Sequence, residues 1–321
     1  MKIFRIAGEN MITAGGLTLK NPLCLAPMAG VTTITVREFF SSLGASLTHT
    51  EMISCAGLVR ENAKTYDMMK ISEHEAPLVI QLFANDEKIL VSGAECVLKS
   101  GNKFSAFGIN MACPMPKITR NGSGSALLKD RDKASRLVSG LKKLGMPVWV
   151  KIRKLDDDNN NTLRFIEALI NAGADNVCIH GRTPSQRYEG IADRSIIADT
   201  SKRFEGYISA SGDVKTAEDI SEYLSYGCVL VMIARGAVSN PFLFEEFNGK
   251  YRTNESKLES LIKFSERTSE LSGEHKALVL MKRFAGSILR FNEGSAELRR
   301  RAMMSIKLEE IVKVLREGVM R

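Results

Sequence analysis

Short β-type runs alternate with helical stretches from Leu23 to about residue 240, and this alternation constrains the fold of the 321-residue chain more than any other feature. The runs expected as strands are Leu23–Ala26, Ser46–Thr50, Leu78–Phe83, Ala106–Asn110, Val148–Ile152, Asn176–His180, Tyr207–Ala210 and Val229–Ala234. Helices are expected between them, for example at Asp86–Lys99 and Thr162–Ala172. Eight such cycles predict an α/β fold, a parallel (β/α)8 TIM barrel.

A doubly wound open sheet is the alternative arrangement for such an alternation. That fold usually carries Gly-x-Gly-x-x-Gly directly after its first strand. Nothing of that kind follows Leu23–Met28, so the barrel is favoured.

The pattern changes after Pro241. Residues 255–321 contain no proline, and apolar residues recur there at helical spacing, as in Leu258, Leu261 and Ile262. We therefore predict a catalytic barrel over residues 1–248 and an appended C-terminal α-helical domain over residues 249–321. Residues 251–321 hold 15 Lys and Arg against 10 Glu and no Asp, which is +5 of the chain's net charge of +8. A basic helical appendage of this kind suggests an acidic partner such as RNA.

Composition excludes several classes of protein. The six cysteines form no Cys-x-x-Cys pair and the four histidines no metal-binding spacing, so neither disulfides nor a metal site are expected. The longest clean apolar run, Cys228–Ala234, is far too short to cross a membrane. The first ten residues break into Gly and Glu before a signal peptide could form. A cytoplasmic protein is expected; its oligomeric state is left open, and a monomer is compatible with the sequence.

Polar groups gather where the expected strands end, on the face that carries the active site in TIM barrels. In order, the strand ends are Pro27-Met28-Ala29, Glu51, Gln81, Asn110, Lys151, His180, Ser211-Gly212-Asp213 and Ala234-Arg235-Gly236, and nearly every one carries a polar group. Each has a structural alternative, since Met28 can fill a core and a lone histidine such as His180 is often a core residue. The two glycine-bearing turns follow strands seven and eight, where barrels commonly hold a phosphate.

Cys113 lies just past the fourth expected strand, next to Pro114. A free cysteine is usually a small buried hydrophobe, which suits Cys178 within a strand but not a thiol on the catalytic rim. The segment Asn121–Ser125 resembles a phosphate loop but follows the strand by ten residues, and we expect a flexible lid there.

Together these segments resemble the tRNA-dihydrouridine synthase family. The resemblance rests on LAPMAGVT, LVIQLFAND, INMACPMPK, VWVKIR, IHGRT, SASGDV and MIARGAVSNP, which occur in the family's order and spacing, and on GEHKALVLMKRF in the helical part. It implies an FMN-binding barrel with a helical tRNA-binding domain. It also implies an oxidoreductase that reduces chosen uridines of tRNA to 5,6-dihydrouridine, with NADPH recharging the flavin.

The resemblance also implies roles for individual residues. Cofactor contacts fall on Pro27, Met28, Ala29, Gln81, Lys151, His180, Ser211, Gly212, Asp213, Ala234 and Arg235, and the catalytic cysteine is Cys113. The chain departs from the family at Ala112 and Ala234, where Gly is usual, and at Ser211, where Asn is common.

The chemistry of uracil agrees with a thiol at Cys113. Hydride from reduced FMN adds at C6, negative charge builds at C5, and a weak acid must then deliver a proton to C5. A cysteine thiol, with an ordinary pKa of about 8.5, is mostly protonated at neutral pH and suits that task. Asn110 is a candidate to hold the base, which must be turned out of the folded tRNA.

Three other functions remain open at this point. Another FMN-dependent barrel acting on a small pyrimidine or enone would share the cofactor site but would not need the basic helices. An RNA-binding protein that kept an old barrel would bind no flavin. A metal-dependent barrel hydrolase lacks carboxylate and histidine ligands at most strand ends.

Overall fold

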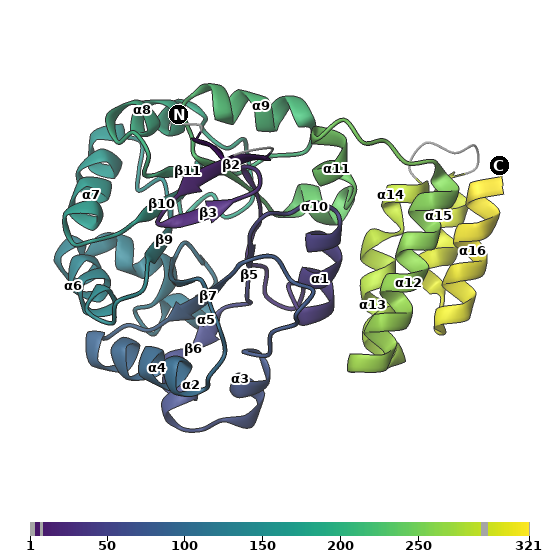
Figure 1. The fold of residues 1–321 in the computed structure, drawn as a ribbon, viewed down its shortest axis with the longest axis horizontal. Coiled ribbons are helices and arrows are strands. Elements are labelled where there is room, and N and C mark those ends of the chain that lie inside the picture. The colour runs from purple at the N-terminus through teal and green to yellow at the C-terminus, as the bar shows by residue number, and fades with distance from the viewer. Residues whose placement is uncertain (1–3, 7–8, 290–294, 321) are drawn as a thin grey trace.

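The computed structural model describes residues 4–6, 9–289 and 295–320. Its central element is a parallel barrel with helices on the outside (Figure 1). The barrel strands are β4 (Leu23–Leu25), β5 (Thr48–His49), β7 (Leu78–Phe83), β8 (Ala106–Met111), β9 (Val148–Arg153), β10 (Asn176–His180), β11 (Ile208–Ser211) and β12 (Leu230–Ile233). They run in the order β4-β12-β11-β10-β9-β8-β7-β5, which confirms the predicted barrel.

The ring of strands closes between β4 and the residues just before β5. Cys24 and Leu47 form a parallel bridge, and two backbone hydrogen bonds flank it, from Ser46 to Leu23 at 3.0 Å and from Leu25 to Leu47 at 2.9 Å. The second strand was expected over residues 46–50, but β5 covers only Thr48–His49 because the residues before it pair with β4 alone. A further short strand, β6 (Ile53–Ser54), pairs with β7 and was not predicted.

Helices cover the outside of the barrel. They are α1 (Ile34–Ser42), α2 (Cys55–Val59), α3 (Ala63–Asp67), α4 (Glu87–Lys99), α5 (Pro116–Thr119), the 3₁₀ helix η1 (Gly124–Lys129), α6 (Arg131–Lys142), α7 (Asn159–Asn171), α8 (Ser195–Arg203), α9 (Ala217–Ser225), α10 (Arg235–Ser239) and α11 (Leu243–Phe247). Several begin at a side-chain cap. Asp86 accepts from the Ile89 N–H to start α4, and Thr216 with Asp219 forms a capping box at α9.

Alternate residues along each strand face opposite sides, so the barrel has two apolar layers. The outward residues, such as Ile80, Phe107 and Val150, pack against the helices in the larger core. The inward ones, including Leu47, Val79 and Trp149, form a smaller cluster inside the barrel. The strands are thus buried on both faces, as expected of a parallel sheet.

A hairpin that the sequence analysis missed closes the amino-terminal end of the barrel. Its strands are β1 (Phe4–Ile6), β2 (Glu9–Ala14) and β3 (Leu17–Leu19), and β2 and β3 lie across the barrel in Figure 1. Ile12, Ala14 and Leu19 join the inner cluster. The Trp149 indole N–H donates to the Gly15 carbonyl at 2.9 Å, which joins the hairpin's turn to the start of β9.

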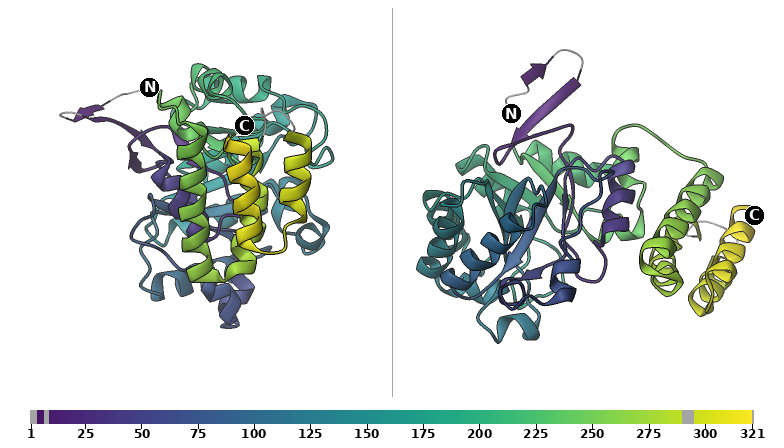
Figure 2. Two further views of the ribbon diagram at one scale, coloured as in Figure 1. Left: turned by 90° about the vertical axis from the view of Figure 1, so that its right-hand side faces the viewer. Right: turned by 60° about the horizontal axis from the view of Figure 1, so that its bottom comes forward.

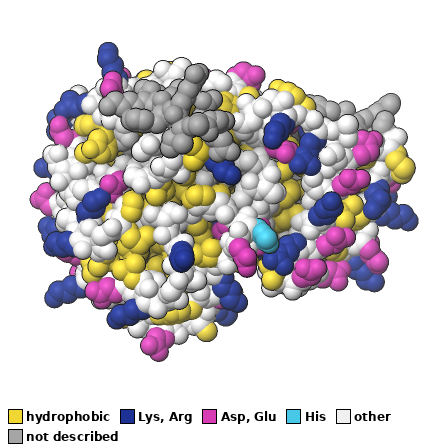
Figure 3. All heavy atoms as spheres, viewed as in Figure 1, with side chains coloured by type: hydrophobic (Ala, Val, Ile, Leu, Met, Phe, Trp, Pro, Cys, Tyr) yellow, Lys and Arg dark blue, Asp and Glu magenta, His cyan; other side chains and the backbone are white. Residues whose placement is uncertain are grey.

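Beyond α11 the chain crosses to a separate helical bundle beside the barrel (Figures 1 and 2). Its helices are α12 (Asn254–Ser272), α13 (Glu274–Phe284), α14 (Gly286–Leu289), α15 (Ser295–Met304) and α16 (Leu308–Met320). The predicted division at residue 248 falls in the segment between α11 and α12. On the face drawn in Figure 3, Lys and Arg side chains of the bundle are interspersed with Asp and Glu.

The bundle packs on α1 through aromatic rings. Phe39 lies 4.8 Å from Phe264 and 6.1 Å from Phe284 between ring centroids, and Phe40 lies 6.0 Å from Phe284. Beside this apolar seam, Arg267 of α12 donates twice to the Glu38 carboxylate of α1, at 3.2 Å each. Burial of the rings supplies most of the attraction here, and the ion pair fixes the orientation.

The closing hairpin makes a stability prediction. Gly15 has a φ of +54°, and a Cβ there would lie 2.7 Å from two Trp149 ring atoms and 2.8 Å from the Asn176 Cβ. Gly15→Ala therefore combines left-handed strain with overpacking and should cost about 2–4 kcal/mol of unfolding free energy. Gly101→Ala is the matched control, because Gly101 has a φ of +75° and open space around its Cβ position. It should cost only about 1 kcal/mol in urea denaturation; equal losses for the two variants would refute the close packing at Gly15.

Candidate active site

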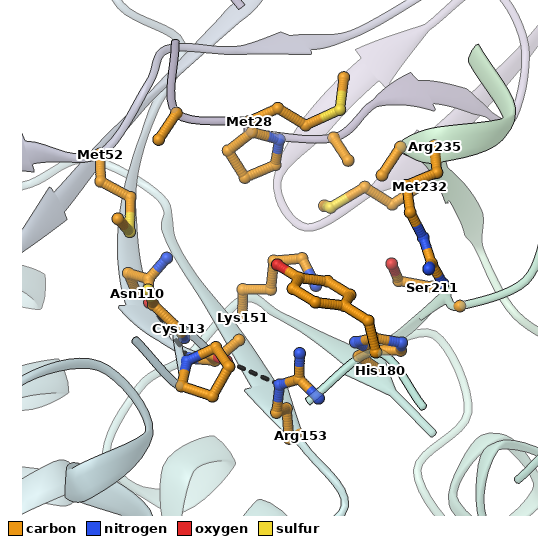
Figure 4. A pocket seen from close by; sticks show the side chains of 18 of the residues that line it. Met28, Met52, Asn110, Cys113, Lys151, Arg153, His180, Ser211, Met232 and Arg235 are labelled. Carbon is orange, nitrogen blue, oxygen red and sulfur yellow. Dashed lines mark hydrogen bonds between the residues drawn. The ribbon is translucent and has the colours of Figure 1, made fainter. Parts of the chain in front are cut away.

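A cavity of about 530 Å³ opens at the carboxyl ends of the barrel strands. Twelve of the thirteen residues predicted from the sequence line it: Pro27, Met28, Ala29, Asn110, Cys113, Lys151, His180, Ser211, Gly212, Asp213, Ala234 and Arg235. Gln81 does not. The volume of the cavity lies within the usual range for small-molecule sites. In Figure 4, Cys113 and Asn110 lie across the cavity from His180, Ser211 and Arg235, with Lys151 between the two groups.

The register of the strands sets the level of each polar side chain. Lys151 of β9 pairs with Asn110 on one side and Cys178 on the other, so all three share the inner face. Two residues further along, Arg153 pairs with His180, which in turn pairs with Ser211. The sequence places these six residues in four different strands, and the parallel register brings them into two successive layers.

Lys151 supplies an uncompensated positive charge to the cavity. Burial lowers the pKa of its ammonium from the usual value, and the neighbouring Arg153 lowers it further. Among the residues that the structure describes, no carboxylate forms an ion pair with Lys151. A buried cation without a counter-charge is costly unless a ligand provides one, so the cavity is suited to an anionic or electron-rich ligand.

His180 is neutral and held in one orientation. Burial lowers its pKa to about 2, with further contributions from Lys151 and Arg153. Arg182 lies 3.3 Å from its Nε2, and because a guanidinium can only donate, that nitrogen accepts and the ring proton is on Nδ1. Gly212 packs against the same ring. A Cβ at Gly212 would lie 2.6 Å from the His180 Cδ2, and its φ is +117°, so only glycine fits there.

Asp213 holds two arginines, Arg182 and Arg235, beside the glycine-bearing turns that follow β11 and β12. Its Oδ2 accepts from Arg182 at 2.7 Å and from the Ala192 N–H at 2.9 Å, and its Oδ1 accepts from Arg235 at 3.2 Å. Burial alone would raise the pKa of Asp213, but these hydrogen bonds outweigh it and hold the pKa below its usual value. Asp213 is thus an ionised anchor, and it leaves the Arg235 side chain 54% exposed at the cavity.

The loop that carries Cys113 is fixed by Asn110. The Asn110 Oδ1 accepts from the Cys113 N–H at 2.9 Å and the Ala112 N–H at 3.2 Å, and its Nδ2 donates to the Gln81 Oε1 at 2.9 Å. Gln81 is buried below the cavity and supports the thiol loop through Asn110. The predicted contacts of Gln81 with the cofactor and of Asn110 with the base stay predictions.

The segment Asn121–Ser125 supports the same loop, so its interpretation as a flexible lid was wrong. Ser123 and Ser125 are buried, and the Ser125 N–H donates to the Cys113 carbonyl at 3.0 Å. Gly124 lies against that carbonyl as well, since a Cβ on it would come within 2.7 Å. The glycines here allow close packing under the thiol.

Arg153 is the most informative residue that the sequence analysis missed. Its Nε donates to the Ala112 carbonyl at 2.8 Å, and its Nη1 donates to Thr183 at 3.1 Å and Arg187 at 2.7 Å. It therefore ties the thiol loop to the loop after β10. The available signal was its spacing of two from Lys151, which places both on the inner face.

Tyr188, Met52 and Met232 also line the cavity without having been predicted. Tyr188 lies between two guanidinium groups, with the carbon of Arg153 at 5.6 Å and that of Arg235 at 5.1 Å from its ring centroid. Its ring is half exposed in a loop. No periodicity marks such a loop residue in the sequence; Met232, by contrast, is an inward strand residue.

The described part of the chain offers neither a metal site nor a membrane-spanning helix. No group of three or more His, Cys, Asp or Glu side chains in 4–6, 9–289 and 295–320 is arranged to hold a metal ion. Within the same ranges, no helix has the length and apolar character needed to span a bilayer.

Comparison with known proteins gives a family match along nearly the whole chain and solved structures of similar fold. The family model for dihydrouridine synthase (Dus) matches residues 24–320. A probable tRNA-dihydrouridine synthase of Treponema pallidum is 30% identical over 96% of each chain, and one of Aquifex aeolicus is 31% identical over 93% of this chain and 96% of its own. The tRNA-dihydrouridine synthase B of Pasteurella multocida is 33% identical over 72% of this chain and 70% of its own. Among solved structures, morphinone reductase in complex with tetrahydroNAD has a similar fold, with a TM-score of 0.55 and 13% identity over 74% of this chain and 89% of its own.

The two buried histidines predict how stability depends on pH. Burial lowers the pKa of His49 to about 3 and of His180 to about 2, whereas an unfolded histidine titrates near 6.5. As the pH falls below 6.5, the unfolded chain binds protons that the folded chain does not. The unfolding free energy should therefore fall by about 3 kcal/mol for the pair between pH 6.5 and 5.

Urea denaturation across this pH range measures the effect. His49→Gln removes one of the two titrating groups, so its decline between pH 6.5 and 5 should be about half that of the unchanged chain. A decline as steep as that of the unchanged chain would mean that His49 is not buried in its neutral form.

Proposed function

Because this chain belongs to the dihydrouridine synthase family, we propose that it reduces the C5=C6 bond of specific uridines in tRNA, with FMN as cofactor and NADPH as reductant. The match of family and relatives extends through the helical bundle, which a barrel acting on small pyrimidines or enones would not need. The protein is an oxidoreductase with tRNA as its substrate.

One observation carries the proposal: the Cys113 thiol and the unpaired Lys151 ammonium share a single cavity. A thiol is a proton donor, and a cation stabilises negative charge that develops on a nearby ligand. Reduction of an activated carbon–carbon double bond needs a proton donor and is helped by stabilisation of the developing negative charge. A hydrolase would need a nucleophile with an adjacent base, or a metal, and neither is arranged in the described part of this cavity.

The cavity residues fit FMN. Lys151 provides a positive charge for the electron-rich edge of the flavin ring, and Met28, Met232 and Ala234 provide apolar surface for its faces. Arg235, exposed at the turn after β12, suits the phosphate. When bound and reduced, FMN supplies the hydride that is added to C6 of the uracil ring.

The chain's own residues supply the proton and its geometry. Cys113 delivers the proton to C5, and the Asn110 carbonyl oxygen holds the thiol loop by two backbone N–H groups. The Nε and Nη1 of Arg153 donate hydrogen bonds to backbone carbonyls, which fixes the guanidinium beside the cavity. Its charge stabilises the negative charge that builds on the base. Ala112, which stands where the family usually has Gly, also lines the cavity.

The helical bundle is proposed to hold the tRNA, which must turn its base out into the barrel mouth. Its basic residues are not equivalent. Arg300 bonds to Glu297 at 2.7 Å and Arg301 to Glu317 at 2.7 Å. Among the described residues, Arg299 donates to the Leu289 carbonyl and the Ser295 hydroxyl and forms no ion pair. In the sequence, Lys282 and Arg283 precede Arg290 by eight and seven residues, spacings that predict a shared basic face on a helix. Arg290 lies outside the described residues.

The first test concerns the proton donor. Cys113→Ala should keep FMN and its reduction by NADPH but lower the rate of uridine reduction by about 10²–10⁴-fold, the usual contribution of a general acid. The rates are measured by flavin absorbance and by mass spectrometry of the tRNA. Cys96→Ala, which changes a half-buried cysteine of α4 outside the cavity, is the matched control and should turn over normally. Normal turnover by the Cys113 variant would exclude it as the acid.

The second test concerns the RNA-binding surface. A cation that contacts a phosphate displaces condensed counterions, so its loss lowers the slope of log affinity against log salt by about one. Arg299→Ala should show this change, whereas Arg300→Ala should leave the slope nearly unaltered because Glu297 already neutralises that side chain. Titration of tRNA across a salt series distinguishes the two, and identical slopes for both variants would place the RNA on another surface.

A further inference from the structure

One hydrogen bond joins the helical bundle directly to the wall of the cavity. The Nη1 of Arg283, near the end of α13, donates to the Gly30 carbonyl at 2.9 Å, across a sequence separation of 253 residues. Gly30 directly follows Pro27, Met28 and Ala29, which line the cavity. Arg283 therefore contacts the barrel, although the sequence suggests a residue facing RNA.

The loop around Gly30 is a closed turn whose outer residue depends on side chains from elsewhere. The Val31 and Thr32 N–H groups both donate to the Met28 carbonyl at 3.0 Å, and the Met28 N–H donates to the Thr32 hydroxyl at 3.1 Å. Gly30 itself is exposed. Its N–H donates to the Glu51 carboxylate and its carbonyl accepts from Arg283, so both of its backbone groups are held.

Arg283 is also fixed at its own end. The next residue, Phe284, is buried in the aromatic seam between α1 and the bundle, with its ring 6.1 Å from Phe39 and 5.4 Å from Phe264. That seam and the Arg267–Glu38 pair hold the bundle in place without help from Arg283. The aromatic seam and the Arg267–Glu38 pair therefore place the Arg283 guanidinium against the loop, and neither contact involves Arg283 itself.

We propose that Arg283 is a positioning residue, through which the docked helical bundle holds the loop of residues 28–33 in the shape that contacts the flavin. The inference rests on the proposed function, in which this loop lies against FMN. It makes the bundle part of the catalytic cavity in addition to a tRNA-binding surface. When the bundle moves, Arg283 moves away from the Gly30 carbonyl, and the loop of residues 28–33 in the cavity wall becomes less rigid.

The test compares Arg283→Met with Lys282→Met, which removes a charge from the neighbouring residue of the same helix. Hydrogen exchange of the cofactor-free chain should be several-fold faster across residues 28–33 in the Arg283 variant and unchanged in the Lys282 variant. Amides of α12 and α13 should stay protected in both, because the aromatic seam is intact. A fluorescence titration should show FMN affinity lowered roughly 3–10-fold by Arg283→Met alone, as expected for loss of a charged donor at an exposed site.

Two outcomes would overturn the proposal. One is unchanged exchange and FMN affinity in Arg283→Met; the other is a lower tRNA salt slope with normal FMN binding, which would make Arg283 a phosphate contact. Should Arg283→Met also open the bundle, Arg283→Lys decides, since it keeps a charged donor and should retain most of the loop's protection. If the unchanged chain binds no FMN, the proposed function fails, while the exchange comparison still decides the role of Arg283.

Discussion

The site depends on the parallel register of the barrel strands. Because every second residue points inward, one register produces an apolar base around Trp149 and, above it, a layer with Asn110, Lys151 and Cys178 followed by one with Arg153, His180 and Ser211. A slip of one residue would turn Lys151 and Arg153 outward into the helix layer, where a buried charge has no partner. The outward core of Phe107, Val150 and Ile152 prevents such a slip, so packing on the outside fixes the chemistry on the inside.

The charges of the cavity follow from the same arrangement. Asp213 is committed to Arg182 and Arg235, which leaves Lys151 and Arg153 without a carboxylate among the described residues that line the cavity. Folding must therefore place two cations in a poorly solvated site. An electron-rich ligand offsets that cost, so binding of such a ligand should stabilise the folded chain by mass action as well as equip it for catalysis.

Much of this arrangement is predictable from the sequence, and the rest is not for identifiable reasons. The barrel follows from the strand–helix alternation, and Lys151, His180 and Cys113 follow from their positions at or near strand ends. Gln81 shares the inner face but lies one level too low to line the cavity, a distinction that depends on the tilt and register of β7. Tyr188 is placed by a loop that Arg153 and Asp213 anchor from other strands. The pairing of Arg301 with Glu317 depends on how α15 meets α16, so the run of three arginines looks more basic in the sequence than it is in the folded chain.

The hairpin that seals the amino-terminal end of the barrel has a kinetic consequence. With Gly15 against Trp149 and with Ile12 and Leu19 filling the base, the barrel is closed below the cavity, whose entrance lies at the carboxyl ends of the strands. Under the proposed function, a nicotinamide and a tRNA base must both reach the cofactor's environment through that entrance, so the two compete for it. Reduction of the flavin by NADPH and reduction of the uridine then alternate. At high concentration, each substrate competes with the other for the entrance. By closing the base of the barrel, a small β-hairpin at the opposite end of the molecule thus influences the order in which the two substrates bind.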